Sequence, residues 1–166
     1  MRGRALVSRI HERLLRKRRQ ERGRLKLSWR PGEDPALRIG QPHEAFDIAE
    51  TLLKPVSHRM EEYWAAYAVM PMAGLLYAAS CCGNGAGATW VWLAAAGADV
   101  EMAARMPAGK TRSKSAWLEA AEICRAKVPS LADALVRVDG MDSRQREVVR
   151  CVIREAIAPY GGSQAR

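Results

Sequence analysis

Hydrophobic side chains recur every three or four residues along most of the chain, which is the spacing expected of α-helices with one buried face. Alternation of the β-strand type is confined to residues 25–29 (LKLSW), which predict at most one short strand. Glycine and proline clusters separate the helical stretches from one another. The pattern therefore predicts a mostly α protein, a compact helical bundle of about seven helices.

Capping residues and helix breakers place the expected helices. An amphipathic helix is expected over residues 44–53, ended by Pro55, and a longer one from an N-cap at Ser57 to Cys82, kinked at Pro71. The glycines of residues 83–87 (GNGAG) end the long helix, and an apolar stretch follows over residues 89–96. Further helices are expected after Asp99, after Ser113 or Ser115, from a capping box over residues 130–133 to Gly140, and from Ser143 to Pro159.

No charged side chain occurs between Tyr63 and Ala98, although 27% of the whole chain is charged. Residues 63–82 have the length of a membrane-spanning helix. Against that interpretation, small residues are frequent there, Leu and Val are few, and the aromatic residues are spread through the segment instead of gathering at its ends. We expect buried core, with a transmembrane helix as the alternative. The tryptophans expected on apolar core faces are Trp64, Trp90, Trp92 and Trp117.

Positive charge is concentrated at the N-terminus. Residues 1–26 hold eleven arginine and lysine side chains against two acidic ones, a net charge of +9, whereas the other 140 residues hold sixteen of each sign. Leu6, Ile10 and Leu14 form an apolar stripe among the arginines, which predicts a basic amphipathic helix. The chain thus divides into a basic N-terminal helical arm (residues 1–26), a helical domain (27–160) and a frayed tail (161–166).

An arginine-rich arm attracts polyanions: nucleic acid, an anionic membrane surface or an acidic partner. Arginine outnumbers lysine in the arm, which favours phosphate contact because one guanidinium can engage two phosphate oxygens. Such contacts give affinity for the backbone without reading base sequence. Trp29, beside a turn, is expected either to stack on a base or to cover the edge of the domain. The candidate nucleic-acid-binding residues are Arg13, Arg16, Lys17, Arg18, Arg19, Arg22, Arg24 and Trp29.

Catalytic and metal-binding patterns are weak. The three histidines are far apart, and none lies at zinc-like spacing from a cysteine. Residues 109–111 (GKT) resemble the end of a phosphate-binding loop, but Ala104 stands where that loop requires glycine. The four cysteines, two of them adjacent at Cys81 and Cys82, are expected to be reduced thiols packed as small hydrophobic side chains. We expect no enzyme activity, no cofactor and no metal site.

Residues 64–80, continued through Trp90 and Trp92, resemble the all-α domain of conjugative coupling proteins, the TraG/TraD-like ATPases of type IV secretion, especially those of actinobacteria. In that family a helix of the form W...A......LLYAA follows a segment of the form WxP...DP...A...A..L, to which residues 29–35 and 45–53 are similar. Residues 142–160 look like the helix after that domain. The resemblance covers residues 25–160 and implies an all-helical domain at the mouth of a ring-shaped DNA motor, where it helps recognise the DNA-processing complex.

The phosphate-loop and acidic metal-binding motifs that flank this domain in the family are missing here, so the resemblance implies no ATPase activity. We expect a non-catalytic recognition module of DNA transfer, whose arm binds DNA backbone without sequence preference and whose body binds a relaxase complex or a coupling ATPase. The expected location is the cytoplasm or the inner face of the membrane, since arginines interrupt any apolar signal segment. The alternative is a small membrane-associated protein with residues 63–82 as a transmembrane helix and the arm on anionic headgroups.

Overall fold

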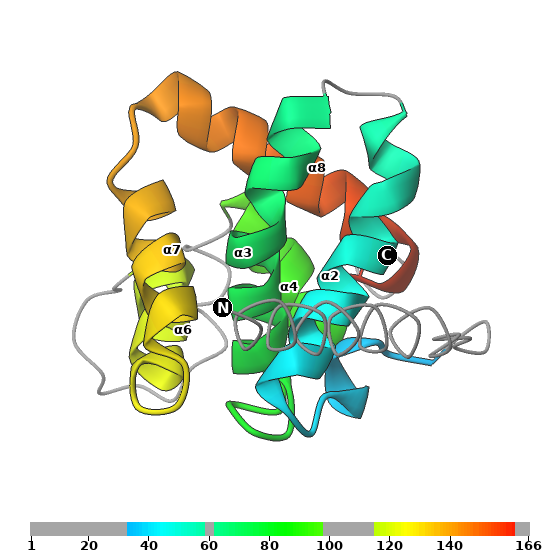
Figure 1. Cartoon of the computed structure of the whole chain (residues 1–166), viewed down its shortest axis with the longest axis vertical. Helices are drawn as coiled ribbons and strands as arrows, with labels where there is room; N and C mark the ends of the chain where they lie inside the picture. Colours follow the sequence, from blue (N-terminus) through cyan, green and yellow to red (C-terminus); the bar gives the residue numbers. More distant parts are fainter. Residues whose placement is uncertain (1–32, 59–61, 98–114, 162–166) are drawn as a thin grey trace, which may run out of the picture. The chain divides into compact units, whose positions relative to one another are not determined.

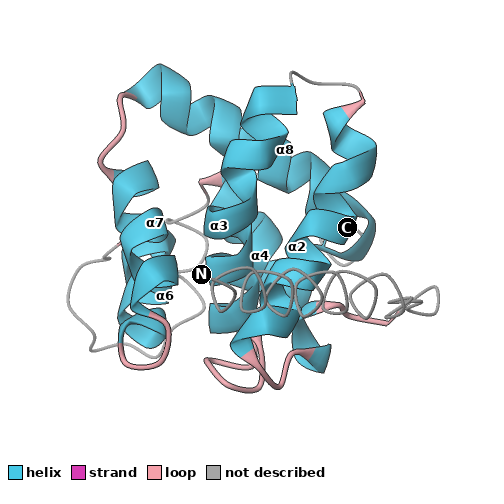
Figure 2. Cartoon of the chain, viewed as in Figure 1, coloured by secondary structure: helices cyan, strands magenta, loops and turns pink. Residues whose placement is uncertain are grey.

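The computed structural model describes residues 33–58, 62–97 and 115–161 (Figure 1). Within these ranges the chain forms one short 3-10 helix and six α-helices, without a strand (Figure 2). The elements are η1 (Ala36–Arg38), α2 (Pro42–Ser57), α3 (Glu62–Ala79), α4 (Gly87–Ala96), α6 (Ala116–Arg125), α7 (Pro129–Asp139) and α8 (Ser143–Gly161). The predicted compact, mostly α-helical fold is confirmed.

Helix α3 forms the centre of the bundle and packs against each of the other described elements, with α2 on one side and α6 and α7 on the other (Figure 1). Every residue from 71 to 80 is buried, because this helix is apolar on all sides and is enclosed by neighbours. The middle of the charge-free segment, residues 71–80, is therefore buried in the core as expected, whereas Tyr63, Ala66 and residues 81–86 are exposed. Among the described helices, none combines the length and the apolar character needed to cross a membrane.

Small residues let the helices approach α3 closely. Leu135 of α7 packs over Gly74, where an added Cβ would lie 2.8 Å from the Leu135 Cδ1 atom. On the same side, the Cys124 thiol of α6 lies 3.5 Å from the Gly74 carbonyl oxygen. Pro71 lies inside α3, which continues as a helix on both sides of it. The packing of α7 thus depends on the absence of a side chain at position 74.

One of the four tryptophans expected in the core is completely enclosed. Trp117 of α6 has no exposed surface, and its indole N–H donates a hydrogen bond of 3.1 Å to the Ala94 carbonyl oxygen of α4. Trp64, Trp90 and Trp92 are only partly buried, so the core prediction is too strong for them. The fully buried positions of their helices are held by smaller or aliphatic residues, Met72, Leu75 and Leu76 in α3 and alanines with Val91 in α4.

The boundary between α2 and α3 differs from the prediction. Pro55 does not end α2, which continues to Ser57. A proline in the last turn removes only one hydrogen bond, and Val56, 2% exposed, anchors that turn in the core. Ser57 is not the N-cap of α3, because its hydroxyl donates to the Lys54 carbonyl oxygen at 2.7 Å within α2.

The long helix also ends earlier than predicted. It stops at Ala79, three residues before Cys82, because the chain turns back on itself there. The Asn84 amide donates to the Ala78 carbonyl oxygen at 2.8 Å, and the Gly83 amide donates to the Ser80 carbonyl oxygen at 3.0 Å. The predicted glycine turn is therefore correct in place, but residues 80–82 belong to the turn and not to the helix.

The remaining helix ends confirm two predicted caps and correct two others. Ser115 caps α6, with its side chain accepting a hydrogen bond from the Leu118 amide, and Gly140 is the C-cap of α7. The capping box predicted over residues 130–133 is wrong, since α7 begins at Pro129, whose missing N–H suits a first helical position. Helix α8 starts at Ser143 as predicted, but it continues past Pro159 to Gly161.

Candidate functional site

The predicted nucleic-acid-binding residues, Arg13 to Trp29, all lie outside the described residues. The same holds for the strand predicted over residues 25–29, the helix predicted after Asp99 and the GKT sequence at 109–111. The structure therefore describes the helical body, and its candidate sites are surfaces of that body.

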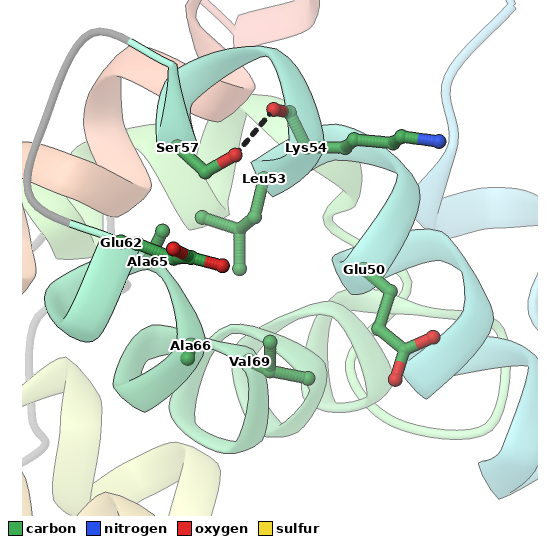
Figure 3. Close-up of a pocket in the computed structure, with 8 residues that line it drawn as sticks. All are labelled: Glu50, Leu53, Lys54, Ser57, Glu62, Ala65, Ala66 and Val69. Atoms are coloured by element: carbon green, nitrogen blue, oxygen red, sulfur yellow. Dashed lines mark hydrogen bonds between the residues drawn. The ribbon is translucent and has the colours of Figure 1, made fainter.

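A small open groove lies between the C-terminal half of α2 and the N-terminal half of α3 (Figure 3). Its volume is about 190 Å³, and its wall is formed by Leu53, Ala65 and Val69. Glu50 and Lys54 stand on the α2 side and Glu62 at the start of α3. The groove has an apolar wall with separate charges around it, an arrangement that suits a contacting side chain from another protein.

A second hollow, of about 260 Å³, lies between α3 and α7. Tyr67, Met70 and Pro71 of α3 line one side, and Ala134 and Arg137 of α7 line the other. Arg137 is the one charged residue in this lining. The hollow thus combines an apolar surface with a single cation, and it adjoins the first groove at Ala66.

An aromatic cluster lies in the N-terminal half of α3, and its Tyr67 lines the second hollow. Tyr63 is 66% exposed, and its ring lies 5.2 Å from that of Trp64 and 6.4 Å from that of Tyr67, centroid to centroid. Ala66 lines both hollows. Positions 63, 66, 67 and 70 follow the i, i+3, i+4, i+7 spacing of one helix face. We call these four residues the α3 stripe. An exposed tyrosine at the end of a largely apolar stripe is typical of a protein contact surface.

The sequence contained a signal for this stripe that the prediction did not use. The tyrosines Tyr63 and Tyr67 are four residues apart in a helix that is apolar on every side, so periodicity alone does not say which face remains open. The face is decided by which neighbours cover the helix, and α2 and α7 leave a strip between them.

The cysteines divide into two groups, which corrects the expectation that all four are packed as small hydrophobic residues. Cys124 fits it: the side chain is fully buried, and burial raises the pKa of its thiol to about 12. Cys151 is partly buried. Cys81 and Cys82 are exposed, because they belong to the turn after α3 and not to the helix.

One buried polar atom lacks a hydrogen-bond partner in the described part of the chain, the Nε atom of Arg150 on α8. The guanidinium of Arg150 lies against Gly97 at the C-terminal end of α4, where the partial negative charge of the helix dipole favours a cation. Its position is thus explained by the fold. Among the described residues, no three His, Cys, Asp or Glu side chains gather in the manner of a metal site.

Comparisons with protein-family models, with curated proteins and with solved structures each find no match for this chain.

Proposed function

We propose that this protein is a non-catalytic accessory module of conjugative DNA transfer, in which the basic arm binds nucleic-acid backbone and the helical body binds a protein partner. The observation that carries the proposal is the segregation of charge. The first 26 residues have a net charge of +9, and the other 140 residues are neutral. A neutral body joined to a concentrated cationic segment separates an electrostatic anchor from a recognition surface.

The arm suits phosphate contact in particular. Nine of its eleven basic residues are arginine, whose planar guanidinium pairs with two phosphate oxygens at once. Each phosphate neutralised releases condensed counterions, so the affinity falls steeply with salt concentration. In this proposal the arm holds DNA without selecting a sequence.

The body supplies the partner surface. The α3 stripe presents Tyr63 to solvent, and its other residues line two adjoining hollows, one beside Lys54 and the other beside Arg137. We take the kind of partner from the resemblance to the all-α domain of coupling proteins. The resemblance suggests a relaxase complex or a coupling ATPase in the cytoplasm. Tyr63 and Tyr67 are the residues on which we expect this contact to depend most, because exposed tyrosines often dominate protein interfaces.

The test measures DNA binding at a series of salt concentrations, with the fluorescence anisotropy of a labelled duplex as the signal. An arm variant replaces five basic residues by glutamine: Arg16, Lys17, Arg18, Arg19 and Arg22. A matched body variant removes five exposed positive charges outside the arm: Lys54, Arg125, Lys127, Arg137 and Arg144. Both variants have the same net charge, so they differ only in where the charge is lost.

We expect the slope of log K against log salt to become shallower by about 0.9 for each phosphate contact that the arm variant loses. The body variant should keep the slope of the unaltered protein. Equal losses in both variants would show that binding follows net charge and not the arm. Absence of duplex and single-strand binding by the unaltered protein would refute the nucleic-acid part of the proposal.

A further inference from the structure

Two adjacent thiols, Cys81 and Cys82, are exposed on the turn between α3 and α4. This turn lies beside the segment that joins η1 to α2 (Figure 1). The Cys81 Sγ atom lies 3.3 Å from the carbonyl oxygen of Ile39. The Cys82 Sγ atom lies 3.8 Å from the same oxygen and 3.4 Å from the carbonyl oxygen of Gly40. Both thiols therefore point toward one place, although neighbouring residues often direct their side chains apart.

The turn that carries the two thiols is held by hydrogen bonds on both sides of them. The Ser80 hydroxyl, which is buried, donates to the Tyr77 carbonyl oxygen at 2.7 Å and accepts from the Cys82 amide at 3.1 Å. The Ser80 carbonyl oxygen accepts from the amides of Gly83 and Gly85 at 3.0 and 2.9 Å. The backbone at Cys82 is thus held in place before any ligand arrives, which lowers the entropy lost on binding.

We propose that Cys81 and Cys82 form a two-thiolate site for a soft monovalent metal ion of the Cu(I) class. Thiolate sulfur is a soft ligand that selects Cu(I) over the harder ions. A structural zinc site needs four protein ligands, and no third or fourth His, Cys, Asp or Glu joins the pair within the described residues. An ion satisfied by two sulfur ligands is therefore the one that this turn can hold.

Binding exchanges bonds without any change of oxidation state. The two S–H bonds break, two S–Cu bonds form, and two protons pass to solvent, so the affinity rises with pH. The thiols at the same time lose their hydrogen bonds to the carbonyl oxygens of Ile39 and Gly40. The ion thereby changes the contact between the α3–α4 turn and the start of α2.

The other cysteines serve as internal controls. Cys124 is fully buried, and its thiol donates to the Gly74 carbonyl oxygen at 3.5 Å, so no ion can reach it without unfolding. Cys151 stands apart on α8 and is partly buried. Replacing Cys81 or Cys82 by serine is expected to leave the fold intact, because both side chains are exposed.

The experiment is an anaerobic Cu(I) titration of the reduced full chain against a chromogenic Cu(I) chelator. We expect one Cu(I) held per chain, with an affinity that falls by more than about 100-fold in Cys81→Ser and in Cys82→Ser, beyond the loss typical of an outer-shell change. Cys151→Ser should bind as the unaltered protein does. Retention of Cu(I) by Cys81→Ser or Cys82→Ser, or the failure of the unaltered protein to compete with the chelator, would overturn the proposal.

A second probe tests the convergence of the thiols directly. Phenylarsine oxide condenses with two nearby thiols to form two S–As bonds and one water molecule. The reduced protein should bind one equivalent of phenylarsine oxide. An excess of a monothiol should not remove the bound arsenical, whereas a dithiol should remove it. An arsenical adduct that a monothiol displaces would show that the two sulfur atoms do not act together. Both experiments are independent of DNA binding, so their outcome does not depend on the function of the arm.

Discussion

The Asp34 carboxylate caps helix α4 through the backbone amide of Ala88, 54 residues further along the chain. Its Oδ2 atom accepts a hydrogen bond of 2.8 Å from this amide. Its Oδ1 atom accepts another of 2.8 Å from the Ala36 amide at the start of η1. The residue at the N-cap position of α4, Ala86, has no side chain that can do this. One carboxylate therefore joins the beginning of the helical domain to one of its core helices.

Replacing Asp34 by alanine should lower the free energy of unfolding by about 1–2 kcal/mol, the usual cost of losing a helix N-cap. Asp34→Asn is the matched control, because its amide oxygen can still accept one of the two hydrogen bonds and asparagine caps helices well. Urea unfolding followed by circular dichroism measures both variants. Equal stability of the alanine variant and the unaltered protein would contradict the capping role.

Gly87 should tolerate alanine worse than Gly85 does, although both have a positive φ, of 71° and 69°. Each alanine variant meets the strain of the left-handed region, about 1–2 kcal/mol. At Gly85 nothing lies within 4 Å of the added Cβ, whereas at Gly87 the Cβ would collide with the Asp34 carboxylate. The difference in unfolding free energy between the two variants measures this collision. It should shrink when Asp34→Ala is combined with each of them.

Trp117→Phe should destabilise the bundle by about 1–3 kcal/mol, because the buried Ala94 carbonyl oxygen loses the indole N–H that lies 3.1 Å from it. Thermal and urea unfolding measure the change. Trp92→Phe, on a partly buried ring, is the control and should cost less. An equal cost for the two substitutions would mean that lost ring area, and not the hydrogen bond, determines the effect.

The buried thiol of Cys124 predicts a loss of stability in alkali. Burial raises its pKa from 9.0 to about 12 in the folded chain. Below pH 9 the thiol is neutral in both states, so it adds no pH dependence. Between pH 9 and 12 the unfolded chain releases the proton while the folded chain keeps it, so the free energy of unfolding falls as the pH rises.

Cys124→Ala removes this ionisation and should flatten the fall of stability between pH 9 and 11, measured by urea unfolding at each pH. The difference between the two slopes measures the contribution of Cys124 together with its effect on Tyr77, whose pKa is raised mainly by burial and in part by Cys82 and Cys124. Parallel slopes would show that the thiol is not shielded in the folded chain. Alkylation at pH 8 gives a second check, because native Cys124 should stay unmodified while unfolded chain reacts.

Tyr63→Ser should leave the unfolding free energy within about 0.5 kcal/mol of the original value, because the ring is 66% exposed. The same substitution should weaken binding of the body to a relaxase complex or coupling ATPase, measured by co-purification from a conjugative system. Val136→Ser, at an exposed position of α7 (40%), provides a control of similar surface character. Identical partner binding by both variants would show that the α3 stripe is not part of the partner surface.

Several features of the fold that depend on local sequence were predicted correctly, although the capping box over residues 130–133 was not. The helical period of residues 116–125, the serine cap before them and the glycine turn at 83–87 all depend on neighbours within a few residues. The buried character of residues 71–80 followed from composition, since a helix that is apolar on every side has to be enclosed.

Helix ends were predicted less well, for a physical reason. Pro55 and Pro159 each lie in the last turn of a helix, where a proline removes one hydrogen bond, and buried residues, Val56 and Gly161, lie beyond them. Propensity describes the isolated segment, while the contacts that extend a helix come from elsewhere in the bundle.

By itself the sequence determined the helical class, the concentration of positive charge in residues 1–26 and the segment that forms the core, because periodicity, charge and hydropathy are properties of consecutive residues. Only the tertiary structure decided that Asp34 caps α4, that the α3 stripe stays open and that Cys81 and Cys82 converge on Ile39. Each of these depends on contacts between segments far apart in the chain, whose distances arise only when the helices pack.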